Sequence, residues 1–265
     1  MAFGALVVAT VAAFFITQHL KVTTPLIAGF PSPYPSAINP VSGVTCYDPV
    51  THKYVDHRFM TISFYLLHRS DEVDVWIADR HGQLVATLAS GRFMPGGSHP
   101  VRSKFTWDGR GDSGQVAPDG PYYVKVHLIH QGRTITISDN NGPLPVTVKT
   151  VAPQPSITSV SPSTTSASHL VPIRIGYAGN EDRAATVLIY RLDGQRPPVV
   201  VKTFLSSARG QTATWDGVIH RQPAAPGTYL IGLQVTDAAC NTGRFPVSLS
   251  PLPAGAARTE VTVTQ

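Results

Sequence analysis

One short loop of this chain combines residue types that could do chemistry. Gly111-Asp112-Ser113-Gly114 has the composition of a loop that presents a nucleophilic serine. Hydrolysis by such a serine also needs a histidine base and a buried aspartate, and no Thr-Ala-Ala-His-like segment is present to supply the histidine. Because glycine and aspartate are also favoured in tight turns, we interpret the loop as a turn and predict that the protein is not an enzyme.

The same loop contains Arg110-Gly111-Asp112, the tripeptide of cell-adhesion ligands. Turn chemistry accounts for its glycine and aspartate without an adhesive role. We therefore interpret the tripeptide as part of the same turn.

Acidic and imidazole side chains raise the question of a metal site. Asp108, Asp112 and Asp119 could offer oxygen ligands to calcium, but their spacing fits no known calcium loop. His127 and His130 lie three residues apart on a predicted strand, so they point to opposite faces and cannot share a zinc ion. We predict neither a bound metal nor a cofactor.

Cys46 and Cys240 lie in different halves of the chain and lack the spacing of a metal site. His52 and His57, in an irregular segment with Asp56 between them, are interpreted as surface histidines. An oxidising compartment would permit a disulfide, provided that the two Cα atoms come within about 7 Å. The sequence gives no reason to expect that approach and leaves the pairing open.

The composition is that of a two-domain β protein. The 265 residues include 23 prolines and 22 glycines, and only 14% are charged; a single domain typically uses about 100 to 150 residues. The net charge of +5 is spread along the chain with no basic run. Without a basic patch or interleaved aromatic residues, nucleic-acid binding is not expected.

Residues 1–21 begin with MAFGALVVATVAAFFITQHL, the one strongly apolar stretch. A helix that crosses a bilayer needs about 20 apolar residues. A cleaved signal peptide would show a basic start and a small-x-small cleavage site, and neither is present. We therefore expect an anchor that meets the membrane through residues 1–20 and holds the other residues outside the cytoplasm. Secretion after signal cleavage is the alternative.

An internal repeat organises the remaining chain. Two sets of turn and aromatic residues recur in the same order at offsets of 107 or 108 positions, which indicates two copies of one unit. The first set is Trp107, Asp108, Gly109, Pro118, Gly120 and Tyr122, and the second is Trp215, Asp216, Gly217, Pro226, Gly227 and Tyr229.

Strand periodicity surrounds these motifs. Apolar residues alternate with other residues over 73–78, 124–129 and 229–235, the pattern of strands that bury one face. In the first copy Pro118 suits a type I turn with Gly120 at its fourth position, whereas Pro226-Gly227 suits a type II turn. Short strands between turns, over about 100 residues per copy, predict an all-β fold of two tandem β-sandwiches.

The expected organisation follows from these patterns. We assign residues 1–21 to the anchor, 22–52 to a proline-rich stalk or irregular first edge, 53–150 to the first domain, 151–168 to a linker rich in proline and serine, and 169–265 to the second domain.

The motif order of hydrophobic strand, D-x-x-G-x turn, W-D-G and P-x-G-x-Y resembles the immunoglobulin-like domain of flagellar hook-capping proteins, called FlgD-like. Both copies fit, over about 59–148 and 171–250. The segment 236–243 is similar to the D-x-A-G-N ending common in such bacterial domains, with Cys240 where glycine is usual. The resemblance implies Ig-like sandwiches in a binding or scaffolding role and supplies no catalytic residues.

We therefore expect a non-catalytic, membrane-anchored extracytoplasmic protein that acts as a spacer, adhesion or assembly module, with an unidentified protein or envelope partner. An accessory region of a larger cell-surface enzyme and a flagellar hook assembly scaffold are the alternatives.

Overall fold

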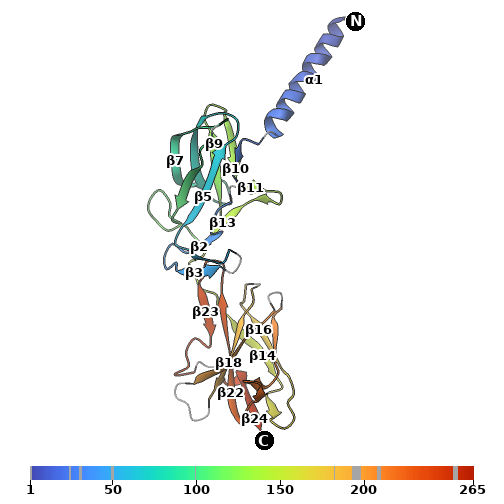
Figure 1. Cartoon of the computed structure of the whole chain (residues 1–265), viewed down its shortest axis with the longest axis vertical. Helices are drawn as coiled ribbons and strands as arrows, with labels where there is room; N and C mark the ends of the chain where they lie inside the picture. Colours follow the sequence, from blue (N-terminus) through green and yellow to red (C-terminus); the bar gives the residue numbers. More distant parts are fainter. Residues whose placement is uncertain are drawn as a thin grey trace. The chain divides into compact units, whose positions relative to one another are not determined.

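The computed structural model describes residues 2–23, 25–29, 32–48, 51–98, 100–181, 183–192, 198–207, 210–252 and 256–265, with side chains of the N-terminal helix at residue 4 and residues 6–15. Within these residues the chain is mostly β, with two β-sandwich regions and one N-terminal α-helix (Figure 1). Two compact units divide it. The first comprises Met1–Tyr34, Met60–Ala117 and Pro121–Val146, and the second Pro35–Phe59, Pro118–Gly120 and Thr147–Gln265.

The N-terminal segment forms helix α1 (Ala2–Thr23). The helix expected over residues 1–21 is thus present, although Met1 lies outside the described residues. Among the residues that the structure covers, no helix combines the length and the apolar character that a bilayer crossing requires.

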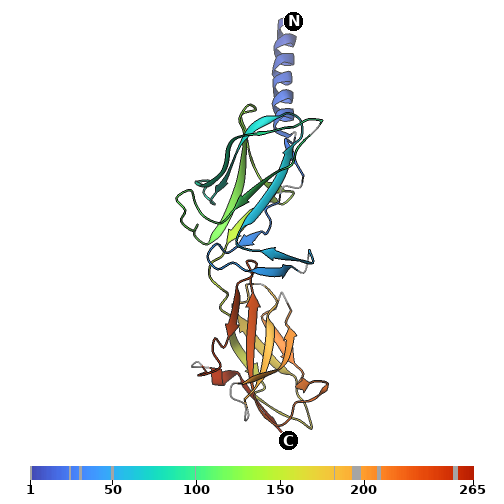
Figure 2. The same ribbon diagram turned by 60° about the vertical axis from the view of Figure 1, so that its left-hand side comes forward.

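The first sandwich consists of a smaller sheet with the order β1-β5-β8 and a larger sheet with the order β2-β13-β9-β6-β7, in which β10 also pairs with β9. Figure 2 shows these strands from a second side. Their bounds are β1 (Ile27–Ala28), β2 (Ala37–Ile38), β5 (Met60–Leu66), β6 (Asp71–Ala78), β7 (Leu84–Met94), β8 (Ser103–Trp107), β9 (Gly120–Leu128), β10 (Arg133–Thr136) and β13 (Pro145–Val148).

The core of this sandwich follows the alternation seen in the sequence. Val73, Val75 and Ile77 of β6 are fully buried. Every second residue of β9 from Val124 to Leu128 is also fully buried. On β5, the apolar residues at positions 60, 62, 64 and 66 are buried while the residues between them are partly exposed. The predicted strand faces are therefore confirmed.

The second sandwich consists of a smaller sheet with the order β14-β16-β19 and a larger sheet with the order β15-β24-β22-β17-β18, in which β23 also pairs with β22. Their bounds are β14 (Ser156–Ser161), β15 (Thr164–Ser166), β16 (Ile173–Ala178), β17 (Thr186–Arg191), β18 (Val199–Leu205), β19 (Thr212–Trp215), β22 (Gly227–Thr236), β23 (Thr242–Phe245) and β24 (Glu260–Thr264). A 3-10 helix, η1 (Ala256–Thr259), precedes β24.

The larger sheet of the second sandwich buries side chains on both faces. Its inner face packs the main core around Trp215 and Tyr229. On the outer face Leu188, Tyr190 and Leu230 form a second cluster, which Leu192, Leu249 and Leu252 cover. This covering accounts for the nearly continuous burial along β22.

The two sandwiches share one topology. In the first sandwich, β5 neighbours β8 in the smaller sheet, and the larger sheet contains the order β9-β6-β7. In the second sandwich, β16 neighbours β19, and the larger sheet contains the equivalent order β22-β17-β18. In both, a short strand also joins the larger sheet in parallel, β2 against β13 and β15 against β24. Because parallel pairing of such short strands is uncommon, its recurrence supports two copies of one unit.

Two expected connections contain more structure than the sequence predicted. The predicted linker 151–168 contains β14 and β15, so that prediction is wrong for those residues. The predicted stalk 22–52 contains β1, β2 and part of a hairpin made by β3 (Thr45–Asp48) and β4 (Lys53–Asp56). Short strands rich in serine, threonine and proline lack the apolar alternation that would reveal them. Further small hairpins pair β11 (Ser138–Asp139) with β12 (Gly142–Pro143) and β20 (Val218–Ile219) with β21 (Gln222–Pro223).

Candidate functional site

The repeated motif of the first copy supports the core. Trp107 ends β8 and is buried, and its ring meets Tyr122 edge-on with 5.2 Å between centroids. Its indole Nε1 donates to the carbonyl of Arg110 at 2.7 Å. Asp108 Oδ1 accepts the backbone N–H of Arg110 at 3.0 Å, and Gly109 takes a φ of 76°. The chain thus reverses directly after the buried tryptophan.

The second copy repeats this geometry. Trp215 meets Tyr229 edge-on at 5.5 Å, and Nε1 of the indole donates to the carbonyl of Val218 at 3.3 Å. Asp216 Oδ1 accepts the backbone N–H of Val218 at 3.0 Å, and Gly217 takes a φ of 74°. The equivalent residues of the two copies therefore play equivalent parts in folding.

Lys202 adds an ion pair to the second copy. Its Nζ lies 2.7 Å from Asp216 Oδ1. Burial alone would raise the pKa of Asp216, but the ammonium of Lys202 and the N–H of Val218 outweigh it and hold that pKa below its usual range.

The two proline-glycine segments are more alike than the sequence predicted. Gly120 and Gly227 open β9 and β22 with φ values of 150° and 151°. A type II turn would give its glycine a φ of about 80°, so the type II assignment of Pro226-Gly227 is wrong. Pro118 and Pro226 each precede the glycine that begins the central strand.

The loop from Gly111 to Gly114 is held as a turn. Gly114 N–H donates to the carbonyl of Gly111 at 2.8 Å, and Asp112 accepts the backbone N–H and the hydroxyl of Thr87 at 2.7 and 3.0 Å. Arg110 Nη1 donates to the carbonyl of Gly114 at 3.0 Å. Both charged side chains of the Arg-Gly-Asp tripeptide are therefore engaged within the fold.

The other acidic candidates also have donors of their own. Asp108 caps the turn after Trp107, and Asp119 accepts the N–H and the hydroxyl of Thr150, the latter at 2.8 Å. Each of the three carboxylates thus bonds a different part of the chain: Asp108 the N–H of Arg110, Asp112 Thr87, and Asp119 Thr150.

The two histidines near the end of β9 have separate partners. His127 Nδ1 lies 3.0 Å from Thr134 Oγ1, whereas His130 Nδ1 lies 2.9 Å from the buried carboxylate of Asp71. Asp71 also accepts the backbone N–H of His130 and the amide of Gln131. Burial raises the pKa of Asp71, but these donors outweigh it, so the pKa lies below its usual range.

A cluster that the sequence did not predict lies within the second unit. Cys46 and Cys240 form a disulfide with 6.4 Å between their Cα atoms. A ring nitrogen of His57 and the two Sγ atoms all lie within 4.8 Å of one another. We call these three residues the cystine-histidine cluster. The expectation that His57 is a surface residue is wrong, since only 6% of it is exposed.

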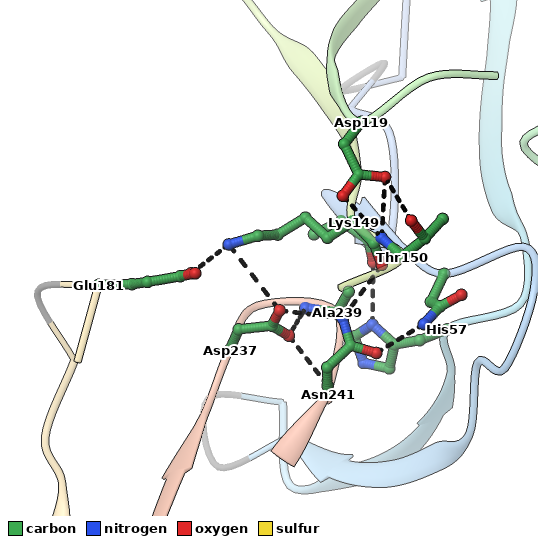
Figure 3. A network of polar contacts seen from close by, with 10 residues as sticks. His57, Asp119, Lys149, Thr150, Glu181, Asp237, Ala239 and Asn241 are labelled. Carbon is green, nitrogen blue, oxygen red and sulfur yellow. Dashed lines mark hydrogen bonds and ion pairs between the residues drawn. The ribbon is translucent and has the colours of Figure 1, made fainter. Parts of the chain in front are cut away.

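The turn that carries Cys240 explains how the cluster is built; Figure 3 shows the polar contacts of this turn at Asp237, Ala239 and Asn241. Cys240 has a φ of 63°, the left-handed conformation that glycine adopts freely and other residues adopt at a cost. The buried Asp237 fixes this turn, because its carboxylate accepts the N–H groups of Ala239 and Asn241 and the side-chain amide of Asn241. The D-x-A-G-N turn is thus retained with cysteine in place of glycine.

Residues 35–59, here called the strap, are fastened to this turn by more than the disulfide. Asn39 Nδ2 donates to Asn241 Oδ1 at 2.7 Å, and the amide of Asn241 in turn donates to the carbonyl of Lys149 at 3.0 Å. Lys149 Nζ pairs with Glu181 and lies 3.8 Å from Asp237. The strap is therefore held to this turn by a part-buried hydrogen bond as well as covalently.

The sequence held one overlooked signal for this cluster. A cysteine stands at the glycine position of a recurrent turn, where its left-handed backbone is unfavourable without compensation. The disulfide partner and His57 lie far away along the chain, so spacing rules could not connect them.

A comparison with protein families supports one of the two predicted copies. Residues 55–132 match the family model of the FlgD Ig-like domain, so the chain contains one such domain there. No curated protein sequence matches the chain.

Solved structures that match cover 78% of this chain at low identity. They include dimeric latent PorU from Porphyromonas gingivalis, at 12% identity with a TM-score of 0.28, and a marsupial T cell receptor, at 11% identity with a TM-score of 0.36. The chain spans 18% of the PorU chain and 69% of the receptor chain.

Proposed function

We propose that the protein is a non-catalytic extracytoplasmic binding and spacing module built from two copies of the FlgD-type Ig-like domain. The disulfide indicates an extracytoplasmic location, because such bonds persist in oxidising compartments. The first copy rests on the family match. The second is supported by the same strand order and by the tryptophan, aspartate and glycine geometry that both sandwiches share.

The observation that carries a binding role is the edge of the first sandwich. Strand β7 is the last strand of its sheet and spans 11 residues. Beside it lies an open hollow of about 410 Å³, in which Trp76 of β6 and Leu84 of β7 supply apolar surface; the lining is completed by Asp74, Thr87, Ala89 and Ser90. Leu84 is 60% exposed.

An extended protein segment fits this surface by its chemistry. The free edge of a sheet offers backbone donors and acceptors that an added strand can pair with, and neighbouring apolar hollows select its side chains. Asp112 already bonds the edge of β7 at Val85 and Thr87, so we assign this role to the remainder of β7. We assign the partner to the class of envelope proteins that present an extended segment.

We further propose that α1 carries the chain through export and attaches it to the membrane. Its described apolar side chains are exposed, including Leu6, Val8, Phe14 and Phe15. Cell fractionation tests this: the full chain should pellet with membranes, and a soluble extracellular form that lacks α1 would instead show cleavage.

Matched substitutions on the two edge strands test the binding role. Leu84→Glu places a charge beside the hollow, whereas Leu205→Glu does the same at an exposed position of β18, the equivalent strand of the second sandwich. The full chain with a C-terminal tag is crosslinked in intact cells and purified. The partner should be recovered with wild type and Leu205→Glu and lost with Leu84→Glu. A partner that persists with Leu84→Glu would place binding elsewhere, and no partner at all would favour a passive spacer.

A further inference from the structure

The cystine-histidine cluster brings together three donors that soft metal ions prefer. Thiolate and imidazole are the ligands of zinc in proteins. A ring nitrogen of His57 and the sulfurs of Cys46 and Cys240 lie within 4.8 Å of one another. Tetrahedral zinc, with bonds of about 2.0 to 2.3 Å, holds its ligand atoms roughly 4 Å apart. To reach this geometry the two sulfurs must separate after the disulfide is broken, and the imidazole nitrogen must move by about 1 Å at most.

The hydrogen bond that His57 makes fixes the tautomer that a metal ligand needs. Its Nδ1 lies 2.9 Å from the carbonyl oxygen of Ala37. A carbonyl only accepts hydrogen bonds, so Nδ1 carries the proton and Nε2 keeps its lone pair. A backbone carbonyl on the second ring nitrogen is the arrangement that fixes metal-binding histidines.

The backbone that holds the three donors does not depend on the disulfide. Cys46 lies on β3 opposite Val55 of β4, and the N–H of His57 donates to the carbonyl of Val44 at 3.1 Å. Cys240 is held by the Asp237 turn, in which its N–H donates to the carbonyl of Asp237 at 3.2 Å. The donors therefore stay close to one another when the sulfur–sulfur bond is broken.

We propose that, in its reduced state, this cluster is a zinc site made of Cys46, His57 and Cys240. A dithiol reductant supplies two electrons and two protons, is itself oxidised to a disulfide, and converts the cystine to two thiols. Zinc then displaces one proton from each thiol and forms two zinc–sulfur bonds, with neutral His57 as the third ligand and water in the fourth position.

Disulfide and zinc exclude each other because both use the same sulfurs. Both the disulfide and a bound zinc ion would link the strap to the Asp237 turn. The link is the disulfide under oxidising conditions and zinc coordination where the thiols stay reduced.

Zinc binding by the full chain tests the proposal. The chain is reduced with a dithiol, desalted without oxygen and titrated with zinc against a chromophoric chelator, and cobalt is used as a spectroscopic probe. The reduced chain should bind one equivalent of zinc, and cobalt should give a sulfur charge-transfer band with the visible spectrum of a tetrahedral site. The oxidised chain should bind none.

Two histidine variants make the test specific. His57→Ala should lower zinc affinity at least about tenfold, whereas His52→Ala, at an exposed position of the β3–β4 hairpin, should not change it. Thiol counting on oxidised His57→Ala checks that the disulfide still forms and hence that the strap still folds. Absence of one-to-one binding by the reduced chain, equal binding by the oxidised chain, or unchanged affinity in a folded His57→Ala would overturn the proposal.

Discussion

Trp107 and Trp215 each fill the core of a sandwich and each keep the indole N–H bonded to a carbonyl three residues further on. A buried N–H without a partner costs about 1 to 3 kcal/mol, so the turn that follows each tryptophan satisfies its polar atom. The aspartate and glycine of that turn serve the same end. At the scale of single residues, the repeated motif is a device for burying a large ring at a chain reversal.

Removal of one of these rings should be far costlier than removal of the third tryptophan. Trp215→Ala should lower the free energy of unfolding by about 3 to 5 kcal/mol, because it leaves a cavity in the core. Trp76 lies half-buried on the outward side of β6, and Trp76→Ala should cost clearly less. Urea denaturation followed by circular dichroism compares them, and similar losses would contradict the assignment of Trp215 to the core.

Asp71 should make the stability of the first sandwich depend on acid pH. Its folded pKa lies below its unfolded value, which is about 3.9. The stability that this carboxylate contributes is therefore present above the unfolded pKa and is lost as the pH falls through the folded pKa. Asp71→Asn should weaken this dependence and lower the free energy of unfolding at pH 7 by about 1 to 3 kcal/mol.

The measurement is the midpoint of urea denaturation between pH 7 and pH 2. Asp139→Asn is the matched control, because Asp139 is an exposed turn residue that accepts the N–H of Asn141. An acid dependence that Asp71→Asn leaves intact would show that other groups cause it.

At the scale of elements, long strands could be predicted from the sequence and short ones could not. Strands β6, β9 and β22 carry apolar residues at every second position, and their inner faces were predicted correctly. Strands β2 and β15 have two or three residues each and pair with partners about 100 residues away. Nothing local marks such strands. In the same way, the long stretch of chain that separates Cys240 from Cys46 and His57 hid their meeting.

Strand β23, which follows the Asp237 turn, should tolerate no side chain at Gly243. A Cβ there would overlap the carbonyl of Pro153, which belongs to the backbone and cannot swing away. Gly243→Ala should therefore lower the melting temperature by several degrees, since backbone shifts cost about 1 to 3 kcal/mol. Gly210→Ala, where a Cβ meets only ordinary contacts of 3.7 Å or more, is the control. Equal melting temperatures of the two variants would show that the backbone around Gly243 and Pro153 is more adaptable than its contacts indicate.

Loss of the disulfide should destabilise the second unit without unfolding it. The double substitution Cys46→Ser and Cys240→Ser should lower the free energy of unfolding by about 2 to 5 kcal/mol, the range for disulfides that close long loops. The Asn39 and Asn241 contacts would still hold the strap. Hydrogen exchange should show the largest loss of protection at β3 and β4, and uniform loss over the second sandwich would contradict this view of the strap.

At the scale of the whole molecule, the cysteines are 194 positions apart in the sequence, and the strands from β5 to β22 all fall between them. The same disulfide that fastens the strap therefore encloses most of both sandwiches in one covalent loop. Sequence reasoning placed the cysteines in separate halves and gave no reason to join them. The strap explains why the cysteines meet. Residues 35–59 belong to the second compact unit, although most of them precede residues 55–132, which match the FlgD Ig-like domain.

This loop sets the path of mechanical load. Tension applied between the first and last residues passes from the N-terminal segment to Cys46, across the disulfide and out through β23 and β24. Strands β1, β2, β23 and β24 pair with strands inside the loop and must first detach from them. After that, the enclosed chain, whose ends are 194 positions apart in the sequence, bears none of that tension. At about 3.4 Å per extended residue, about 650 Å of contour stays locked away. Single-molecule pulling should release this length only after a reductant is added, and its release from the oxidised chain would exclude such a bypass. A protein fastened at one end and pulled at the other would stretch at its two ends while the interior of both sandwiches remained unloaded.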